Sequence, residues 1–152
     1  LINFLETSKK QIKKIVFTNG CFDLIHPGHI DYLRKAKQYG DLLIVGINSD
    51  KSITRIKGKD RPINNLETRI KNLEAFPFID KIVSFDEDTP ESLINNIVPD
   101  VLVKGGDYNI EDVVGREVVQ KTGGKVIIID LLEGYSSSKI IDKIVKLNKT
   151  KN

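Results

Sequence analysis

Residues 19–29 read Asn19-Gly20-Cys21-Phe22-Asp23-Leu24-Ile25-His26-Pro27-Gly28-His29. The apolar run at residues 15–18 predicts a buried strand before them, and the Pro-Gly pair predicts a helix start, because proline is tolerated in a first helical turn. A turn from strand to helix presents unpaired backbone N–H groups, to which the helix dipole adds partial positive charge. His26 and His29 stand at positions i and i+3, so both imidazoles can address one ligand. Since Gly28 leaves the backbone bare, the stretch predicts a phosphate site.

The length of 152 residues predicts a single domain over residues 1–152, in which residues 1–14 form an amphipathic helical lead-in. A net charge of +3 with both signs mixed does not indicate nucleic-acid binding. The lone cysteine precludes an intrachain disulfide and fits a reducing compartment. No apolar run reaches the length of a membrane span. We therefore expect a cytoplasmic protein with neither a nucleic-acid nor a membrane partner.

Apolar runs alternate with helical patterns along the chain. The predicted strands are 15–18, 42–47, 80–85, 100–104 and 125–129, and the predicted helices are 30–36, 66–76, 90–97, 113–121 and a last one after 136–138. Residues 52–65 break this alternation, and we interpret them as a mobile basic loop. The alternation predicts an α/β fold in which a five-stranded parallel sheet is covered by helices on both faces.

Ligands bind such sheets beyond the carboxyl ends of the strands. The unusual stretches of this chain follow predicted strands one, two, four and five, so we expect them to gather at one edge. In the basic loop, Arg55, Lys57 and Arg61 are cations that can neutralise a triphosphate, and Arg69 can join them from the next helix. Exposed loops are often charged without binding anything, and this alternative stays open.

Two further stretches have both an ordinary and a functional interpretation. Gly105-Gly106-Asp107-Tyr108 is either a simple turn or a surface against which a base or sugar lies, with Asp107 holding a hydroxyl or a metal-bound water. Ser136, Ser137 and Ser138 are either an ordinary helix cap or a phosphate site at a helix start. For each stretch alone the two interpretations are about equal, and their convergence on one edge favours function.

Rival chemistries lack their signatures. Zinc-protease helices place histidines at i and i+4 around a glutamate, whereas here the spacing is i+3 with no glutamate between. Neither G-x-G-x-x-G nor G-x-x-x-x-G-K-[ST] occurs, which disfavours dinucleotide oxidoreductases and P-loop ATPases. Without a cysteine partner or a general base beside it, Cys21 is interpreted as a packing residue and not as a nucleophile.

The stretch from Gly20 to His29, followed by Leu33, resembles the H-x-G-H motif of the cytidylyltransferase-like nucleotidyltransferases. The likeness runs from about Ile15 to the last helix and so covers nearly the whole chain. It implies the nucleotidyltransferase type of fold, a Rossmann-like three-layer αβα sandwich. It also implies transfer of a nucleoside monophosphate with release of pyrophosphate.

Later stretches are similar to the adenylyltransferase domains of the bacterial ADP-heptose synthases. They are Arg55-Ile56-Lys57-Gly58 with Arg61-Pro62, residues 83–90 and residues 103–108. The likeness implies ATP and D-glycero-β-D-manno-heptose 1-phosphate as substrates. Glycerol-3-phosphate cytidylyltransferases, which use CTP and a polyol phosphate, are the alternative. They carry R-T-E-G-I-S-T-T where this chain has Leu131-Leu132-Glu133-Gly134-Tyr135-Ser136-Ser137-Ser138. A nucleotide-binding module without turnover is a third possibility.

The resemblance also implies roles for residues. The implied catalytic residues are His26, His29 and Lys57. The two histidines contact the nucleotide phosphates, and Lys57 with Arg55 holds the triphosphate or the sugar phosphate. Asp23 fixes the turn. The implied nucleotide-binding residues are Gly20, Cys21, Phe22, Asp23, Gly28, Gly106, Asp107, Ser136, Ser137 and Ser138, and the implied acceptor-binding residues are Arg55, Arg61 and Arg69. Mg²⁺ is expected to arrive with the triphosphate, without a dedicated protein ligand, and the family likeness implies a homodimer.

Overall fold

The computed structural model describes residues 1–132 and 134–151. Two residues of the sequence-based predictions, Glu133 and Asn152, lie outside the described residues. The elements are α1 (Ile2–Lys10), β1 (Ile15–Gly20), α2 (Pro27–Lys37), β2 (Leu42–Asn48), α3 (Asp50–Lys57), α4 (Leu66–Glu74), β3 (Lys81–Phe85), α5 (Glu91–Ile97), β4 (Val101–Gly105), the 3₁₀ turn η1 (Ile110–Asp112), α6 (Arg116–Lys121), β5 (Lys125–Ile129) and α7 (Ser137–Lys151).

The five strands form one parallel sheet with the order β3-β2-β1-β4-β5. The chain moves outward from β1 through β2 to β3, and then crosses back to place β4 on the other side of β1. Such a reversal opens a crevice beyond the carboxyl ends of the two strands where it occurs, here β1 and β4. The predicted Rossmann-like α/β class is confirmed, and the reversal places the candidate site.

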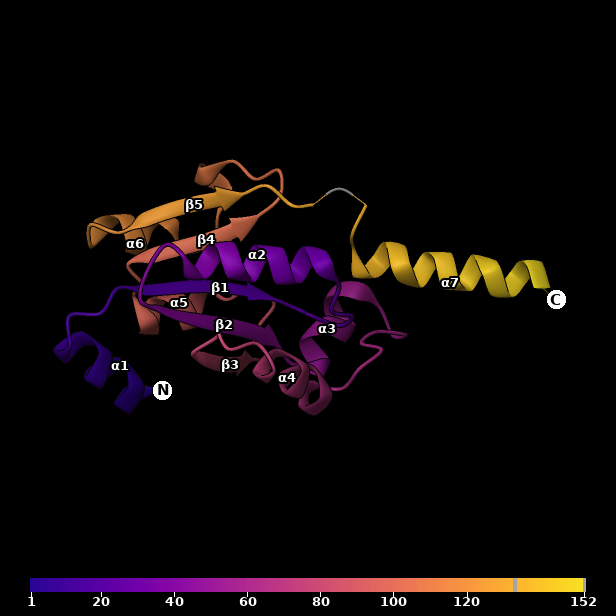
Figure 1. Cartoon of the computed structure of the whole chain (residues 1–152), viewed down its shortest axis with the longest axis horizontal. Coiled ribbons are helices and arrows are strands. Elements are labelled where there is room, and N and C mark those ends of the chain that lie inside the picture. Colours follow the sequence, from indigo (N-terminus) through magenta and orange to yellow (C-terminus); the bar gives the residue numbers. More distant parts are fainter. Residues whose placement is uncertain (133, 152) are drawn as a thin grey trace.

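Helices cover both faces of the sheet because side chains alternate along each strand. On one face, Val16 of β1 packs in a core with Leu33 of α2 and Leu73 of α4. On the other face, Phe17 packs in a second core with side chains of α1, α5 and α6. Figure 1 shows α2 across one face, with α5 and α6 behind the other. Because β1 is buried from both sides, the turn that follows it starts from a rigid base.

Aspartates hold neighbouring strands together at the amino edge of the sheet. The Asp100 carboxylate, just before β4, accepts a hydrogen bond from the backbone N–H of Ile15 in β1 at 2.8 Å. The Asp80 carboxylate, before β3, accepts from the N–H of Leu43 in β2 at 2.8 Å. These carboxylates accept hydrogen bonds from backbone N–H groups that have no partner in the hydrogen-bond ladder of the sheet. The opposite edge remains available for the site.

The predicted loop at residues 52–65 is wrong in its first half, which forms α3. The Ser49 side chain caps this helix by accepting a hydrogen bond from the N–H of Ser52 at 3.2 Å. Ile53 is fully buried, whereas the basic residues of the helix are exposed. One apolar anchor in eight residues is too few to show a helical period, so the pattern looked like a loop.

Two other predicted helices differ in extent. The lead-in helix ends at Lys10 and not at residue 14. The helix expected over 113–121 begins only at Arg116, because Gly115 adopts a φ of +89° that a right-handed helix cannot contain. The short turn η1 precedes it.

The last helix, α7, projects from the carboxyl edge of the sheet away from the rest of the chain (Figure 1). None of the helices that the structure describes combines the length and the apolar character needed to cross a membrane.

Candidate active site

Two histidines cap the start of α2 reciprocally. His26 is the N-cap residue, and its Nδ1 accepts a hydrogen bond from the backbone N–H of His29 at 3.4 Å. In return, Nδ1 of His29 accepts from the backbone N–H of His26 at 3.3 Å. The two rings stack with their centroids 3.8 Å apart. This capping box satisfies two backbone donors of the helix start and fixes both rings.

Both imidazoles are neutral at pH 7. The pKa of His29 is lowered to about 4, mainly by burial and to a smaller extent by the nearby His26, while a hydrogen bond with the Leu24 backbone acts in the opposite direction. Burial also lowers the pKa of His26. In a neutral ring whose Nδ1 accepts a hydrogen bond, the proton is on Nε2. Each ring is therefore a hydrogen-bond donor through Nε2.

Glycine is required at two positions of this turn. A Cβ at Gly28 would lie 2.9 Å from Cε1 of His26 and 3.0 Å from Cβ of Tyr135. A Cβ at Gly20 would lie 2.9 Å from the ring of Phe22, which packs 5.3 Å from the ring of His29. Larger residues would therefore displace the histidines. Close packing of the rings adds a reason for Gly28 to the phosphate approach expected from the sequence.

Asp23 holds the remaining loop in place. Its carboxylate is buried and accepts hydrogen bonds from the N–H of Ile63 at 2.8 Å, the N–H of Asn64 at 2.8 Å and Nε of Arg61 at 3.0 Å. Burial raises the pKa of Asp23, but these hydrogen bonds and the guanidinium charge outweigh it and leave the pKa lowered. The carboxylate thus accepts its hydrogen bonds from the protein itself.

Arg61 joins this loop to the last helix. Besides its pairing with Asp23, its Nη1 donates to Oγ of Ser138 at 3.4 Å. Its Nη2 is buried and has no hydrogen-bond partner among the described residues. Its side chain is only 11% exposed, so it holds the loop against the H-x-G-H turn instead of facing an open cavity.

Arg69 lies beneath the site and not in it. Its side chain is fully buried and donates to the carbonyl oxygens of Cys21 at 2.9 Å, Asn48 at 2.7 Å and Asn64 at 3.0 Å. It also pairs with the Asp50 carboxylate at 2.7 Å. These bonds fasten the loop after β1 to the end of β2. Its guanidinium, which the sequence predicted would bind substrate, is enclosed by backbone carbonyls in this structure.

Arg55 is directed to an acidic turn. Its Nε lies 3.0 Å from the Asp88 carboxylate, and its Nη2 donates to the carbonyl of Asp86. The pair is exposed, so it contributes little to stability. In this pair the guanidinium of Arg55, which the sequence predicted would bind phosphate, is bound to a carboxylate of the protein.

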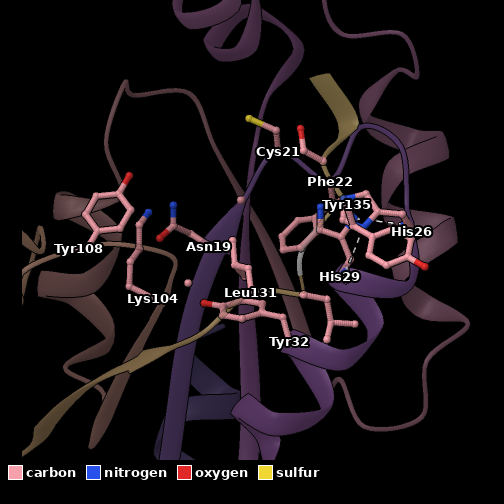
Figure 2. A pocket seen from close by; sticks show the side chains of 15 residues that line it. Asn19, Cys21, Phe22, His26, His29, Tyr32, Lys104, Tyr108, Leu131 and Tyr135 are labelled. Carbon is pink, nitrogen blue, oxygen red and sulfur yellow. Dashed lines mark hydrogen bonds between the residues drawn. The ribbon is translucent and has the colours of Figure 1, made fainter. Parts of the chain in front are cut away.

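A cavity of about 280 Å³ opens at the carboxyl edge between β1 and β4, and we call it the histidine cavity. Figure 2 shows its side chains, with His26 and His29 on one side and Lys104, Asn19 and Tyr108 on the other. Its lining residues are Asn19, Gly20, Cys21, Phe22, His26, Gly28, His29, Tyr32, Lys104, Gly105, Tyr108, Leu131, Leu132, Tyr135 and Ser136.

A second cavity of about 410 Å³ adjoins the first, and we call it the side cavity. Lys57 lines it from the end of α3. The other lining residues are Asn19, Gly20, Cys21, Asn48, Ile56, Asp88, Thr89, Pro90, Leu102, Lys104, Tyr108, Asp112, Val113 and Val114.

The residues of the predicted Ser-Ser-Ser and Gly-Gly-Asp stretches have different positions: some line the histidine cavity and others do not. Ser136 lines the histidine cavity and caps α7 by accepting from the N–H of Lys139 at 3.1 Å. Ser137 donates to the carbonyl of Leu24 at 2.8 Å, so it fastens α7 to the H-x-G-H turn. Gly106 and Asp107 line neither of the two cavities.

Lys104 is a site residue that the sequence reasoning missed. It stands near the end of β4 and lines both cavities. Burial lowers its pKa, and its Nζ lies 5.2 Å from the centroid of the Tyr108 ring. Among the described residues no carboxylate forms an ion pair with it. A lysine at the end of an apolar strand, directly before Gly-Gly, was the available signal.

Cys21 lines both cavities without being activated. Burial raises the pKa of its thiol, although Lys57 and other nearby cations act in the opposite direction. The thiol therefore stays protonated at neutral pH. A protonated thiol is a poor nucleophile.

The described residues offer no metal site of their own. Over residues 1–132 and 134–151, no group of three or more His, Cys, Asp or Glu side chains is placed to hold a metal ion. A divalent ion that accompanies a nucleoside triphosphate would take its ligands from the phosphates.

A parallel sheet that reverses between β1 and β4, with a histidine pair at the helix start beyond β1, defines the nucleotidyltransferase class. Residues 17–143 match the family model described as cytidylyltransferase-like, and the chain belongs to this family. The family resemblance and the enzyme class predicted from the motif are confirmed.

Individual relatives agree with this family. The chain is 52% identical over 146 residues to the bifunctional protein HldE of Geobacter sulfurreducens, covering 96% of this chain and 30% of that protein. It is 49% identical over 144 residues to the HldE protein of Pseudomonas aeruginosa, covering 95% of this chain and 30% of that one. The chain thus spans about 30% of the length of these relatives.

A solved structure shares the fold. The crystal structure of the lipopolysaccharide core biosynthesis protein from Thermoplasma volcanium matches with a TM-score of 0.64 and 27% sequence identity. The match covers 82% of this chain and 99% of that one.

Replacing Arg69 with methionine should lower the free energy of unfolding by about 3 kcal/mol, because three buried carbonyls lose their donor. Arg55→Met is the matched control, and we expect it to cost less than about 1 kcal/mol because its ion pair is exposed. Urea unfolding of both variants measures the difference. Equal losses would show that Arg69 does not hold the loop.

Stability should fall as the pH drops from 6.5 toward 4. The pKa of His29 is about 4 in the folded chain, below the ordinary value of 6.5, so the unfolded chain takes up the proton first. Urea unfolding at pH 7, 6, 5 and 4.5 measures this. In His29→Asn the amide oxygen can still cap the helix but does not titrate, so its stability should change less over this range. Parallel pH curves for the two proteins would contradict the assignment.

Proposed function

We propose that this chain transfers AMP from ATP to D-glycero-β-D-manno-heptose 1-phosphate and releases pyrophosphate. The observation that carries the proposal is the neutral histidine cap at the start of α2, which faces one cavity that adjoins a second. Two joined cavities suit two substrates. The likeness of residues 55–62, 83–90 and 103–108 to ADP-heptose synthases supports the choice of acceptor. The name of the archaeal structure, a lipopolysaccharide core biosynthesis protein, is in keeping with an activated sugar as product.

The nucleotide is proposed to occupy the histidine cavity. Its α-phosphate would lie at the start of α2, where the helix dipole and the Nε2–H donors of His26 and His29 favour an anion. The backbone of Gly20, Cys21 and Phe22 lines the same cavity. Its base and ribose would extend toward Leu131, Tyr135 and Ser136, on the segment that leads into α7.

The reaction is proposed as a direct in-line displacement. An oxygen of the sugar phosphate forms a bond to the α-phosphorus of ATP, and the bond from that phosphorus to the bridging oxygen of the β-phosphate breaks. The electron pair leaves with pyrophosphate. The attacking oxygen is already anionic, so no general base is required. Catalysis then depends on positioning and on donors directed at the developing charge.

Lys57 is proposed to hold an anionic phosphate from the side cavity, which it lines at the end of α3. Mg²⁺, bound to the triphosphate, would neutralise part of the phosphate charge. Gly106, Asp107, Ser137, Ser138 and Arg61 would act by shaping the edges of the site. We also propose that the chain forms a single domain, that it assembles as a homodimer and that it is located in the cytoplasm.

The substrates can be identified by a pyrophosphate-release assay that pairs each of ATP, CTP, GTP and UTP with heptose 1-phosphate and with glycerol 3-phosphate. We expect release with ATP and heptose 1-phosphate to exceed every other pair at least about tenfold, a modest degree of discrimination. Faster release with CTP and glycerol 3-phosphate would show instead that the chain is a cytidylyltransferase that makes CDP-glycerol. ATP binding without release from any pair would indicate a module that binds nucleotide only.

Replacing His29 with alanine should lower kcat about 100-fold or more, because a donor at the α-phosphate is lost together with the fixed position of His26. Circular dichroism and urea unfolding would establish that the variant is folded. The exposed residue Gln38 at the other end of α2 supplies the control, and Gln38→Ala should keep full turnover. Normal turnover in folded His29→Ala would remove His29 from the mechanism.

A further inference from the structure

The histidine cavity and the side cavity meet along the ends of β1 and β4. Their lining residues overlap at Asn19, Gly20, Cys21, Lys104 and Tyr108. A group that passes from the side cavity to the histidines must therefore cross this shared wall. Of the five shared residues, Lys104 alone carries a positive charge.

Lys104 is held at the wall without an anionic partner. Its Nζ lies over the Tyr108 ring, 5.2 Å from the centroid, and no carboxylate of the described residues pairs with it. In Figure 2 it lies across the histidine cavity from His26 and His29. This ammonium is partly buried and faces a cavity, and its charge is balanced only by the contact with the Tyr108 ring. Binding of an anion there would therefore be favourable.

The two cavities are lined by different side chains outside their shared wall. The histidine cavity carries the apolar side chains Leu131 and Leu132 and the ring of Tyr135, against which a base can pack. The side cavity has apolar walls as well, but it also carries Asn48, Thr89 and Asp112, whose polar groups can meet the hydroxyls of a sugar. An acceptor in the side cavity would direct its phosphate to the wall where the cavities join.

We infer that Lys104 binds the phosphate of the acceptor at this junction and directs its oxygen toward the α-phosphorus. The inference rests on the proposed function and names the residue that positions the second substrate. Two phosphate groups must approach each other there, and their repulsion is strong where water is partly excluded. The ammonium offsets this repulsion. It stays protonated throughout, since the attacking oxygen forms its bond and pyrophosphate leaves without any proton transfer.

Lys104→Met tests the inference, with Lys125→Met as the matched control. Lys125 is also a strand lysine, but it is exposed and stands at the amino end of β5, away from both cavities. In Lys104→Met the KM for heptose 1-phosphate should rise about 10- to 100-fold, as expected for a lost charge-assisted hydrogen bond. The KM for ATP should change less than about threefold. Lys125→Met should change neither constant.

Stability separates binding from a structural role. A partly buried ammonium without a counter-ion costs folding free energy, so Lys104→Met should unfold at the same urea concentration as the wild type or at a higher one. Lys104→Gln, which keeps a polar end without the charge, should show the same rise in KM if charge is what matters.

Calorimetric titration with heptose 1-phosphate, without nucleotide, keeps this inference separate from the proposed reaction. Binding by the wild type and by Lys125→Met, but at least about tenfold weaker by Lys104→Met, supports it even if the wild type releases no pyrophosphate. Equal binding by all three proteins, or none by the wild type, overturns it. A rise in the KM for ATP alone would assign Lys104 to the nucleotide and overturn it as well.

Discussion

At the start of α2, the backbone N–H groups of His26 and His29 donate to each other's imidazole Nδ1 atoms, and this reciprocal capping constrains the rest of the site. Because each Nδ1 is an acceptor, each ring must be neutral, and the low pKa that burial imposes on His29 keeps it so. The same pairing brings the rings into a stack, which in turn excludes any side chain at Gly28. The helix start therefore offers an anion two oriented rings and a positive dipole end without carrying a formal charge.

The formal positive charges near the site belong to arginine and lysine side chains. Which of these charges face a cavity depends on the protein group with which each side chain pairs. Arg69 and Arg61 fasten the loops around the H-x-G-H turn to carbonyls, to Asp23 and to α7. Those guanidiniums are fixed by protein acceptors. Of the cations on described residues, the two cavities retain Lys57 and Lys104. A site that is poor in fixed charge but rich in oriented donors suits a reaction whose charge arrives with both substrates.

The sequence predicted most of the fold and pointed to several of the residues that line the two cavities, each for a local reason. Buried parallel strands are continuous apolar runs, so all five were found close to their observed bounds. The histidine pair was found because i, i+3 neighbours on a helix share a face whatever surrounds them. Helix α3 was missed because Ile53 is its one buried apolar residue, which is too few to show a helical period.

The sequence by itself determined the alternation of strands and helices, the helix start at Pro27 and the family to which the chain belongs, since these depend on neighbours a few residues away. Only the tertiary structure decided which basic residues line the two cavities. Arg69 was expected to join the cations of the site, but its guanidinium is enclosed by three carbonyls, two of them from distant segments. Lys104 was expected at the end of a buried strand, but it lines both cavities. The direction of a long cationic side chain is set by the acceptors and the space around it, and those come from parts of the chain that sequence spacing does not bring together.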